Sequence, residues 1–406
     1  MNAVTTFRSA AAASSKTEAG PAQRLSRSYR FADADMDLFF MAAMGWGPAG
    51  GLDIGQLMYI ADTIEDGNAD SWVDSFAAYG AAMDAQADAW LARGHRRIAG
   101  ETRLKAFASY RSAWQFAGPT PRFAELVGEQ RIAFAKAMVE LDLPASFFAV
   151  PWQGRKLPGV HLRHADPQAP LALVIGGADT SYDDLFLTIG RNLLDRGYSV
   201  AMVDLPGQGV TEAEGLYWEA EAEKPIAAAI DLLVRDFGAE PGRVALIGLS
   251  LGGYFVARAA GHETRLATVI ASTPFPSPAE LFRLSVEAAL AHGGGVAATQ
   301  AAQCSRAVTL WKAGATNPAE FLANTAGFVA DPKRVTVPFL SILGTGDSPV
   351  FAAQAEHWDR EIASARKRFV RLDAASGADG HVQVNNRLRL AQECAAWMDE
   401  IFGRAA

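Results

Sequence analysis

A serine flanked by glycines is the residue in this chain whose setting points most directly to chemistry. Ser250 stands at the centre of Gly248-Leu249-Ser250-Leu251-Gly252, directly after an apolar run at residues 244–247. Small residues on both sides let a chain turn sharply from a strand into a helix, which leaves the serine strained and exposed above a sheet. The pattern favours a nucleophilic serine over an ordinary turn.

A serine nucleophile needs a histidine that accepts its proton and an acid that orients this histidine. In the chain order serine, acid, histidine, Asp347 follows a short β-rich run at residues 339–343, and His381 follows another at residues 369–372. Asp347 would project from the carboxyl end of a strand, the edge where parallel sheets carry their sites. We therefore predict Ser250, Asp347 and His381 as nucleophile, acid and base.

Other residues could take two of these roles. Asp373 and Asp379 lie close to His381 in the sequence and remain alternative acids, although their position relative to the strand suits the role less well. His357 also follows Asp347, but it falls in a stretch with a helical pattern, which is typical of a surface histidine.

Backbone N–H groups must stabilise the charge that develops on an attacked carbonyl. One predicted donor is Leu251, directly after the nucleophile, and the other is Gly177 or Ala178, which follow an apolar run at residues 171–175. A Gly-Gly pair also occurs in ordinary turns. No G-x-G-x-x-G motif follows it, and no cluster of histidines or carboxylates has metal-ligand spacing, so we expect neither a cofactor nor a metal.

The elements that must position these residues follow Pro144, where short β-rich runs alternate with helical stretches. Such alternation predicts a largely parallel sheet with helices on both faces. Strands are predicted at residues 147–150, 171–175, 199–203, 244–247, 268–270, 339–343 and 369–372. A helical insert, too long for a simple crossover, is predicted at residues 278–330.

The first part of the chain has a different periodicity. From residue 31 to 145 apolar residues recur at spacings of three and four, as in Leu57, Ile60 and Ile64, which predicts an all-helical domain. A break at Gly94 precedes a helix predicted at residues 98–116. Residues 1–30 are rich in alanine, serine and threonine and are predicted to be a disordered tail. The α/β core is then expected at residues 146–406.

Composition limits the partners of this protein. The 406 residues are 50% hydrophobic and 20% charged, with a net charge of -8 and scattered basic residues, which argues against nucleic acid. No apolar run approaches the roughly 20 residues of a membrane span. Cys304 and Cys394 lack the spacing of a metal site or a disulfide framework. We expect a soluble, cytoplasmic protein that binds a small molecule.

From residue 31 to its end, the chain resembles the α/β-hydrolases that carry an N-terminal helical cap. The motifs that carry the resemblance are Gly94-His95, Ser109-Tyr110-Arg111, Leu157-Pro158-Gly159, residues 176–179, residues 204–209, the Ser250 motif and residues 380–385. The resemblance implies the α/β-hydrolase fold, with the helical domain as a cap over the sheet, a substrate pocket between cap and core, and frequent dimers. It also implies a triad of Ser250, Asp347 and His381.

The same resemblance implies hydrolysis of a carbon–carbon bond beside a ketone, as in a 1,3-dicarbonyl, aryl ketone or polyketide-like substrate, or of an ester, in secondary metabolism or catabolism. An acyl-enzyme would form on Ser250 and be released by water. Tyr110, Arg111 and Trp114 are the cap residues that we predict to contact substrate. Aromatic residues at helical spacing also form helical cores, so this prediction competes with a packing role.

Two alternatives remain open. An acyltransferase or cyclase would transfer the acyl group to a nucleophile of the substrate if the cap excluded water. A non-catalytic ligand-binding protein could retain the same fold. Such proteins often lack a member of the triad, whereas here all three candidates occur in order.

Overall fold

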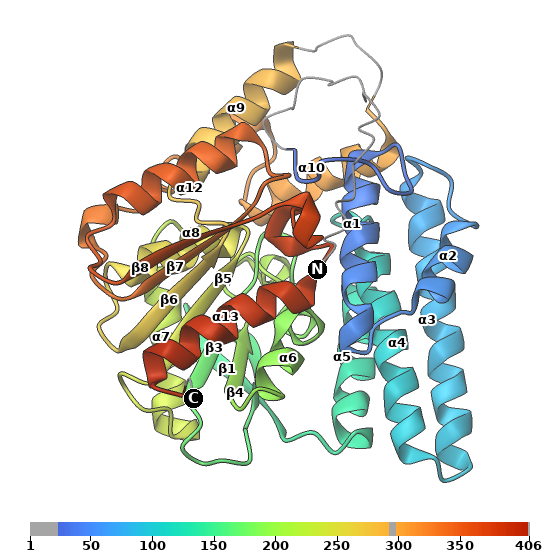
Figure 1. Cartoon of the computed structure of the whole chain (residues 1–406). Helices are drawn as coiled ribbons and strands as arrows, with labels where there is room; N and C mark the ends of the chain where they lie inside the picture. The colour runs from blue at the N-terminus through green and yellow to red at the C-terminus, as the bar shows by residue number, and fades with distance from the viewer. Residues whose placement is uncertain (1–22, 292–297, 405–406) are drawn as a thin grey trace, which may run out of the picture.

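A mostly parallel sheet forms the centre of the molecule (Figure 1). The computed structural model describes residues 23–291 and 298–404, and in this part of the chain eight strands pair in the order β1-β2-β4-β3-β5-β6-β7-β8. From β4 to β8 neighbouring strands are parallel, whereas β2 is antiparallel to both β1 and β4. The strands are β1 (Ala145–Trp152), β2 (Arg155–Leu162), β3 (Leu171–Ile175), β4 (Ser199–Val203), β5 (Val244–Leu249), β6 (Leu266–Ser272), β7 (Phe339–Gly344) and β8 (Lys367–Leu372).

Helices cover both faces of the sheet, because β3, β4 and β5 are buried along their whole length and apolar on both sides. One hydrophobic cluster joins one face of the sheet to α7, α8 and α12, and a second joins the other face to α6 and α13. The helices of this part are α6 (Arg191–Leu194), α7 (Glu223–Phe237), α8 (Leu251–Ala260), α12 (Pro349–Glu361) and α13 (Arg387–Phe402). The fold class predicted from the alternating pattern is confirmed.

One strand, β2, was not predicted. Pro158 and Gly159 lie inside it, and both residues normally argue against a strand interior. A Cβ atom at Gly159 would lie 2.6 Å from the carbonyl oxygen of Met202 in β4, so glycine lets the two backbones approach closely. The seven predicted strands are all present, with ends that differ by a few residues.

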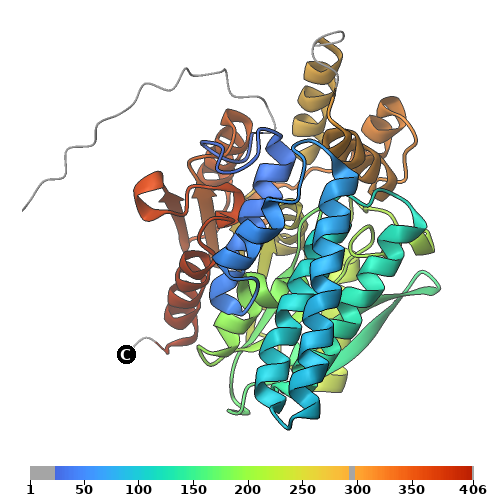
Figure 2. The same cartoon turned by 90° about the vertical axis from the view of Figure 1, so that its right-hand side faces the viewer.

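Long helices stand beside the sheet and pack against one another (Figure 2). They are α1 (Ala34–Gly45), α2 (Ile54–Ala61), α3 (Ala69–Ala92), α4 (Arg96–Trp114) and α5 (Pro121–Glu140). Gly94 adopts a left-handed conformation, with φ of 81°, between α3 and α4, where the break was predicted. The second hydrophobic cluster continues from the sheet into these helices without a gap. The division at residue 145 into two domains therefore stays a prediction.

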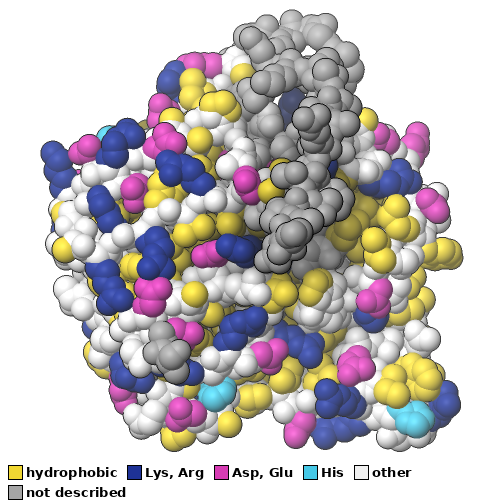
Figure 3. Space-filling model, viewed as in Figure 1, with side chains coloured by type: hydrophobic (Ala, Val, Ile, Leu, Met, Phe, Trp, Pro, Cys, Tyr) yellow, Lys and Arg dark blue, Asp and Glu magenta, His cyan; other side chains and the backbone are white. Residues whose placement is uncertain are grey.

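A helical insert separates β6 from β7, as predicted. It contains α9 (Pro278–Ala291), α10 (Gln300–Lys312) and α11 (Pro318–Thr325). Short helical turns complete the chain: η1 (Gly47–Ala49), η2 (Phe186–Gly190), η3 (Thr211–Glu214), η4 (Pro332–Arg334), η5 (Ala374–Ser376) and η6 (His381–Gln383). None of the helices in the described ranges has the length and apolar character needed to cross a membrane. On the face shown in Figure 3, acidic and basic side chains are interspersed.

The N-terminal segment differs from its prediction. Of the tail predicted at residues 1–30, residues 1–22 lie outside the described part. Tyr29 and Arg30, at the end of this segment, make specific contacts: the carboxylate of Asp37 in α1 accepts hydrogen bonds from their N–H groups and from that of Phe31, the next residue. This buried acceptor orders a segment whose composition alone resembles that of a disordered chain.

Candidate active site

Ser250 occupies a strained turn between β5 and α8. Its φ of 56° is unusual for a residue with a side chain. A Cβ atom at Gly248 would lie 2.2 Å from the carbonyl oxygen of Gly252, and one at Gly252 would lie 2.5 Å from that of Gly176. The two flanking glycines are therefore required by sterics, and they leave Ser250 partly exposed at the carboxyl edge of the sheet.

The structure brings Ser250, His381 and Asp347 together. His381 Nε2 lies 2.8 Å from Ser250 Oγ, and His381 Nδ1 lies 2.6 Å from Asp347 Oδ1. The other oxygen of Asp347 accepts a hydrogen bond of 2.9 Å from the hydroxyl of Thr273. With its Nδ1–H donated to this buried carboxylate, the imidazole presents Nε2 as an acceptor for the serine proton. The arrangement can therefore generate an alkoxide at Ser250.

The alternative residues lie elsewhere. Asp373 accepts a hydrogen bond from the Ser376 N–H at the start of η5. Asp379 binds the side chains of Ser26 and Asn385. His357 is exposed on α12. Of the three candidate acids, Asp347 is the one that contacts the imidazole of His381.

The predicted oxyanion loop passes directly beside Ser250. A Cβ atom at Gly177 would lie 2.7 Å from Ser250 Cβ. Gln208 Nε2 donates hydrogen bonds to the carbonyl oxygens of Gly176 (2.7 Å) and Gly177 (2.8 Å). Because the C=O and N–H of a trans peptide point in opposite directions, Gln208 turns the N–H groups of Gly177 and Ala178 away from itself. Leu251 begins α8, where N–H groups have no acceptor within the helix.

Gln208 is a residue that we did not predict. Its loop, residues 204–209, was noted in the sequence only as one motif of the family resemblance, because the side chain carries no charge and no nucleophile. Its amide also accepts a hydrogen bond from the Leu205 N–H, at 2.9 Å. The signal that could have identified it is the glutamine between Gly207 and Gly209, directly after β4.

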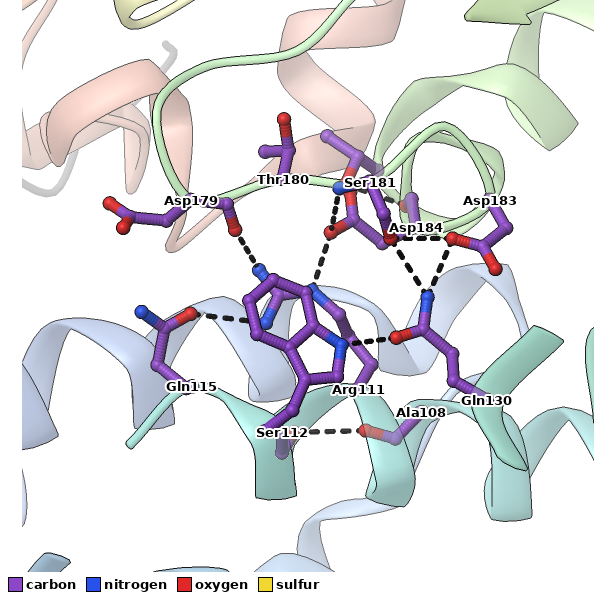
Figure 4. A network of polar contacts seen from close by, with 12 residues as sticks. Ala108, Arg111, Ser112, Gln115, Gln130, Asp179, Thr180, Ser181, Asp183 and Asp184 are labelled. Carbon is purple, nitrogen blue, oxygen red and sulfur yellow. Dashed lines mark hydrogen bonds and ion pairs between the residues drawn. The ribbon is translucent and has the colours of Figure 1, made fainter. Parts of the chain in front are cut away.

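Arg111 of α4 binds the far end of the oxyanion loop (Figure 4). Its guanidinium donates to the carboxylate of Asp184 and to the carbonyl oxygen of Asp179, and Nη1 donates to Gln115 at 3.1 Å. The guanidinium also lies 3.9 Å from the ring centroid of Trp114. Arg111 is buried, and its nitrogens serve to hold the loop.

Gln130 of α5 makes a second attachment to the same loop (Figure 4). Its Nε2 donates to Ser181 Oγ (2.9 Å) and to Asp183 Oδ1 (2.6 Å). Burial raises the pKa of both Asp183 and Asp184, and the neighbouring Arg131 and Arg111 oppose this effect. Two helices of the N-terminal region thus anchor a loop that carries two predicted oxyanion donors.

The three cap residues predicted to contact substrate have different positions. Arg111 lines the pocket that contains Ser250 and His381. Trp114 is buried beside Phe123 and donates to Gln130. Tyr110 packs against Gly80, and burial raises its pKa to about 12. The structure therefore places Trp114 and Tyr110 in the helical packing and away from the pocket lining.

The pocket above the catalytic candidates is lined by apolar side chains, by arginines and by Asp179 and Asp184. Its apolar lining comes largely from α1 and η6, and its basic lining comes from three arginines. These residues are Leu38, Phe39, Ala42, Trp46, Val382, Val384, Arg24, Arg111 and Arg387. Within residues 23–291 and 298–404, no three histidine, cysteine or carboxylate side chains are placed to hold a metal ion.

A serine at the turn after the fifth strand, with an acid after β7 and a histidine after β8, is the arrangement of the α/β-hydrolase class. The model of the alpha/beta hydrolase family matches residues 173–400, and the chain belongs to this family.

The chain is also similar to particular hydrolases. It is 28% identical over 269 residues to a 20-hydroxy-prefusarin hydrolase of Gibberella moniliformis, covering 63% of each protein. It is 28% identical over 266 residues to the hydrolase acrC of Aspergillus aculeatus, covering 59% of this chain and 62% of that one. The match therefore spans less than two thirds of these relatives.

Among solved structures, the 2,6-dihydroxy-pseudo-oxynicotine hydrolase superposes with a TM-score of 0.71 at 19% identity, covering 88% of this chain and 95% of that one. This likeness extends over the N-terminal helices as well as the sheet, and it shows a common fold.

Proposed function

We propose that this protein is a cofactor-free serine hydrolase with Ser250 as nucleophile, His381 as general base and Asp347 as the acid that orients it. The observation that carries the proposal is the continuous hydrogen-bonded chain from Ser250 Oγ through His381 to Asp347 Oδ1. This chain of hydrogen bonds starts at the strained turn between β5 and α8. The predicted backbone donors lie beside it, Leu251 at the start of α8 and Gly177 and Ala178 in the loop after β3.

In the first step His381 Nε2 takes the proton of Ser250 Oγ, and the oxygen attacks the substrate carbonyl carbon. The N–H groups of Leu251 and of Gly177 or Ala178 stabilise the resulting oxyanion. The intermediate collapses to an acyl-enzyme, and His381 returns its proton to the leaving group. Water then attacks the acyl-enzyme, with His381 again as base, and releases an acid and free Ser250.

For the substrate, we propose a 1,3-dicarbonyl or aryl ketone of polyketide-like structure, cleaved at a carbon–carbon bond, or an ester of similar shape. A carbon leaving group departs as a carbanion, so a neighbouring carbonyl must delocalise the charge before His381 protonates it. Apolar walls from Leu38, Phe39 and Trp46 suit such an acyl group. We further propose a role in secondary metabolism or catabolism, which the similarity to a 20-hydroxy-prefusarin hydrolase supports.

The test is a mass-spectrometric screen of wild type and Ser250→Ala against matched panels of aryl 1,3-diketones and aryl esters in ¹⁸O-labelled water. We expect turnover by wild type, loss of about 10⁴-fold or more in Ser250→Ala, and one solvent oxygen in the acid product. Ser28→Ala, at an exposed serine, is the control and should retain wild-type rates.

Other outcomes would narrow the proposal or overturn it. Turnover of esters alone would limit the activity to a carboxylesterase. Product without solvent oxygen would identify acyl transfer or cyclisation. Turnover independent of Ser250, or no labelling of wild type by an active-site phosphonate, would overturn the proposed nucleophile.

A further inference from the structure

A short segment at the N-terminus, residues 23–26, lies between the two loops that carry the proposed acid and base. We call it the N-terminal strap. The N–H of Ser348, next to Asp347, donates to the carbonyl oxygen of Gln23 at 2.9 Å. The N–H of His381 itself donates to the carbonyl oxygen of Arg24 at 2.8 Å. One extended segment therefore binds the backbone of both catalytic loops.

Side chains reinforce these backbone contacts. Ser26 Oγ lies 2.6 Å from Asp379 Oδ2, two residues before His381. A Cβ atom at Gly346 would lie 3.0 Å from the Ser26 nitrogen, and one at Gly380 would lie 3.1 Å from Leu25 Cδ2. The strap thus fits closely against both loops.

The strap is itself fixed to α1. Arg24 forms an ion pair with Asp35, and its guanidinium lies 5.8 Å from the centroid of the Phe39 ring. The Asp37 carboxylate binds the N–H groups that follow the strap. Arg24 also lines the pocket that contains Ser250. The N-terminal helices therefore reach the catalytic loops through this segment.

The loop of His381 needs such support. Val382 and Gln383 follow it with φ angles of 45° and 53°, a left-handed conformation that is unfavourable for residues with side chains. Conformations of this kind persist only where surrounding contacts hold them in place. The bond from the His381 N–H to Arg24 is such a contact, directly at the start of the strained pair.

We propose that the N-terminal strap is a positioning element for catalysis, which sets His381 and Asp347 in register with Ser250. The inference rests on the proposed function, because positioning matters only if this triad reacts. A displacement of about 1 Å in a catalytic group can lower a rate about 100-fold, so loss of the strap should reduce kcat more than it changes KM.

The test uses the full chain with Ser26→Asp, which places a second carboxylate beside Asp379, and Leu25→Asp, which places a charge in the apolar contact with Gly380. Ser28→Asp, an exposed serine two residues beyond the strap, is the matched control. We would measure phosphonate labelling of Ser250, kcat and KM, and amide hydrogen exchange at His381 and Ser348.

In wild type we expect slow exchange at both amides. In Ser26→Asp or Leu25→Asp we expect fast exchange there, unchanged protection in β7, and labelling and kcat lowered by about 10- to 100-fold. Ser28→Asp should match wild type in every measurement. Retained protection of β7 would distinguish a local loss of positioning from general unfolding. If an aspartate variant fails to fold, the milder Ser26→Ala takes its place in the same measurements.

Fast exchange at His381 and Ser348 in wild type would overturn the inference. So would wild-type labelling and kcat in a variant whose two amides have lost protection. A wild-type protein that the phosphonate does not label would instead overturn the proposed function, and the inference with it, whatever the exchange data show.

Discussion

Gly177 and Ser250 approach so closely that no side chain fits between them. The Cβ position at Gly177 lies 2.7 Å from Ser250 Cβ and 3.3 Å from Ser250 Oγ. At the scale of single residues, this contact places the predicted oxyanion loop beside the oxygen of the proposed nucleophile. The same requirement for glycine at Gly248 and Gly252 explains why the site has so little side-chain bulk around its nucleophile.

The substitution Gly177→Ala should therefore lower kcat. The added methyl group must displace Ser250 or the loop, and loss of one oxyanion donor costs about 100-fold or more in kcat. Gly55→Ala on α2, where a Cβ atom would meet nothing within 4 Å, is the control. Steady-state kinetics and thermal unfolding of the two variants provide the comparison. Unchanged kcat in Gly177→Ala would contradict the role assigned to this loop.

At the scale of elements, α4 and α5 hold a loop of the proposed site. Through Arg111 and Gln130 they hold the loop between β3 and η2, which contains Gly177 and Ala178. Arg111 and Asp184 form a buried ion pair, and removal of one partner leaves the other charge buried without compensation. The N-terminal helices therefore bind the predicted oxyanion loop through Arg111 and Gln130, and they bind the strap through α1.

We expect Arg111→Met to destabilise the protein by about 3–5 kcal/mol and to lower kcat. In the double variant with Asp184→Asn, part of this loss should be recovered, because no unpaired carboxylate remains. Urea denaturation in a double-mutant cycle measures the coupling. Arg97→Met, which breaks an exposed ion pair with Glu101 on the same helix, should cost less than about 1 kcal/mol. Equal effects of the two arginine substitutions would contradict the proposed link.

At the scale of the whole molecule, one hydrophobic cluster extends from the N-terminal helices across a face of the sheet, and a second fills the other face. Burial of β2 between β1 and β4 also encloses a histidine, His161, whose ring lies 4.9 Å from that of Phe237. Desolvation, together with the charge of Arg163, lowers the pKa of His161 to about 4. The folded protein therefore keeps this ring neutral where the unfolded chain would protonate it.

The consequence is acid sensitivity. Between the unfolded pKa of about 6.5 and the folded value of about 4, the unfolded chain binds more protons, so stability falls as pH falls through this range. We expect the free energy of unfolding to fall by about 1–3 kcal/mol less in His161→Phe than in wild type as the pH is lowered from 7 to 4. Denaturation of both proteins between pH 7 and pH 4 tests it. Parallel stability curves for wild type and variant would show that His161 does not titrate as described.

Local patterns in the sequence were sufficient for the elements and for the candidates of the site. Short β-rich runs predicted seven strands, and those buried on both faces, such as β3, β4 and β5, have no polar alternation to obscure them. Gly248, Ser250 and Gly252 predicted the turn, because the close approach of Gly248 to Gly252 is local. Glycine at Gly252 is also required by its contact with Gly176, which lies in a loop distant in the sequence. The order of serine, acid and histidine predicted which residues could meet, but it left Asp373 and Asp379 open as acids.

Only the tertiary structure decided which of these residues meet and what holds them. Ser250 and His381 are separated by 131 residues and His381 and Asp347 by 34, so their contacts depend on the pairing of β5 to β8 and not on local sequence. The contacts of Gln208 and of the strap also join segments that are far apart in the sequence. Gln208 donates to the carbonyl oxygens of Gly176 and Gly177, and carbonyl oxygens of the strap accept from Ser348 and His381. Side-chain chemistry can be recognised in a sequence, whereas support by backbone contacts appears only once the chain has folded.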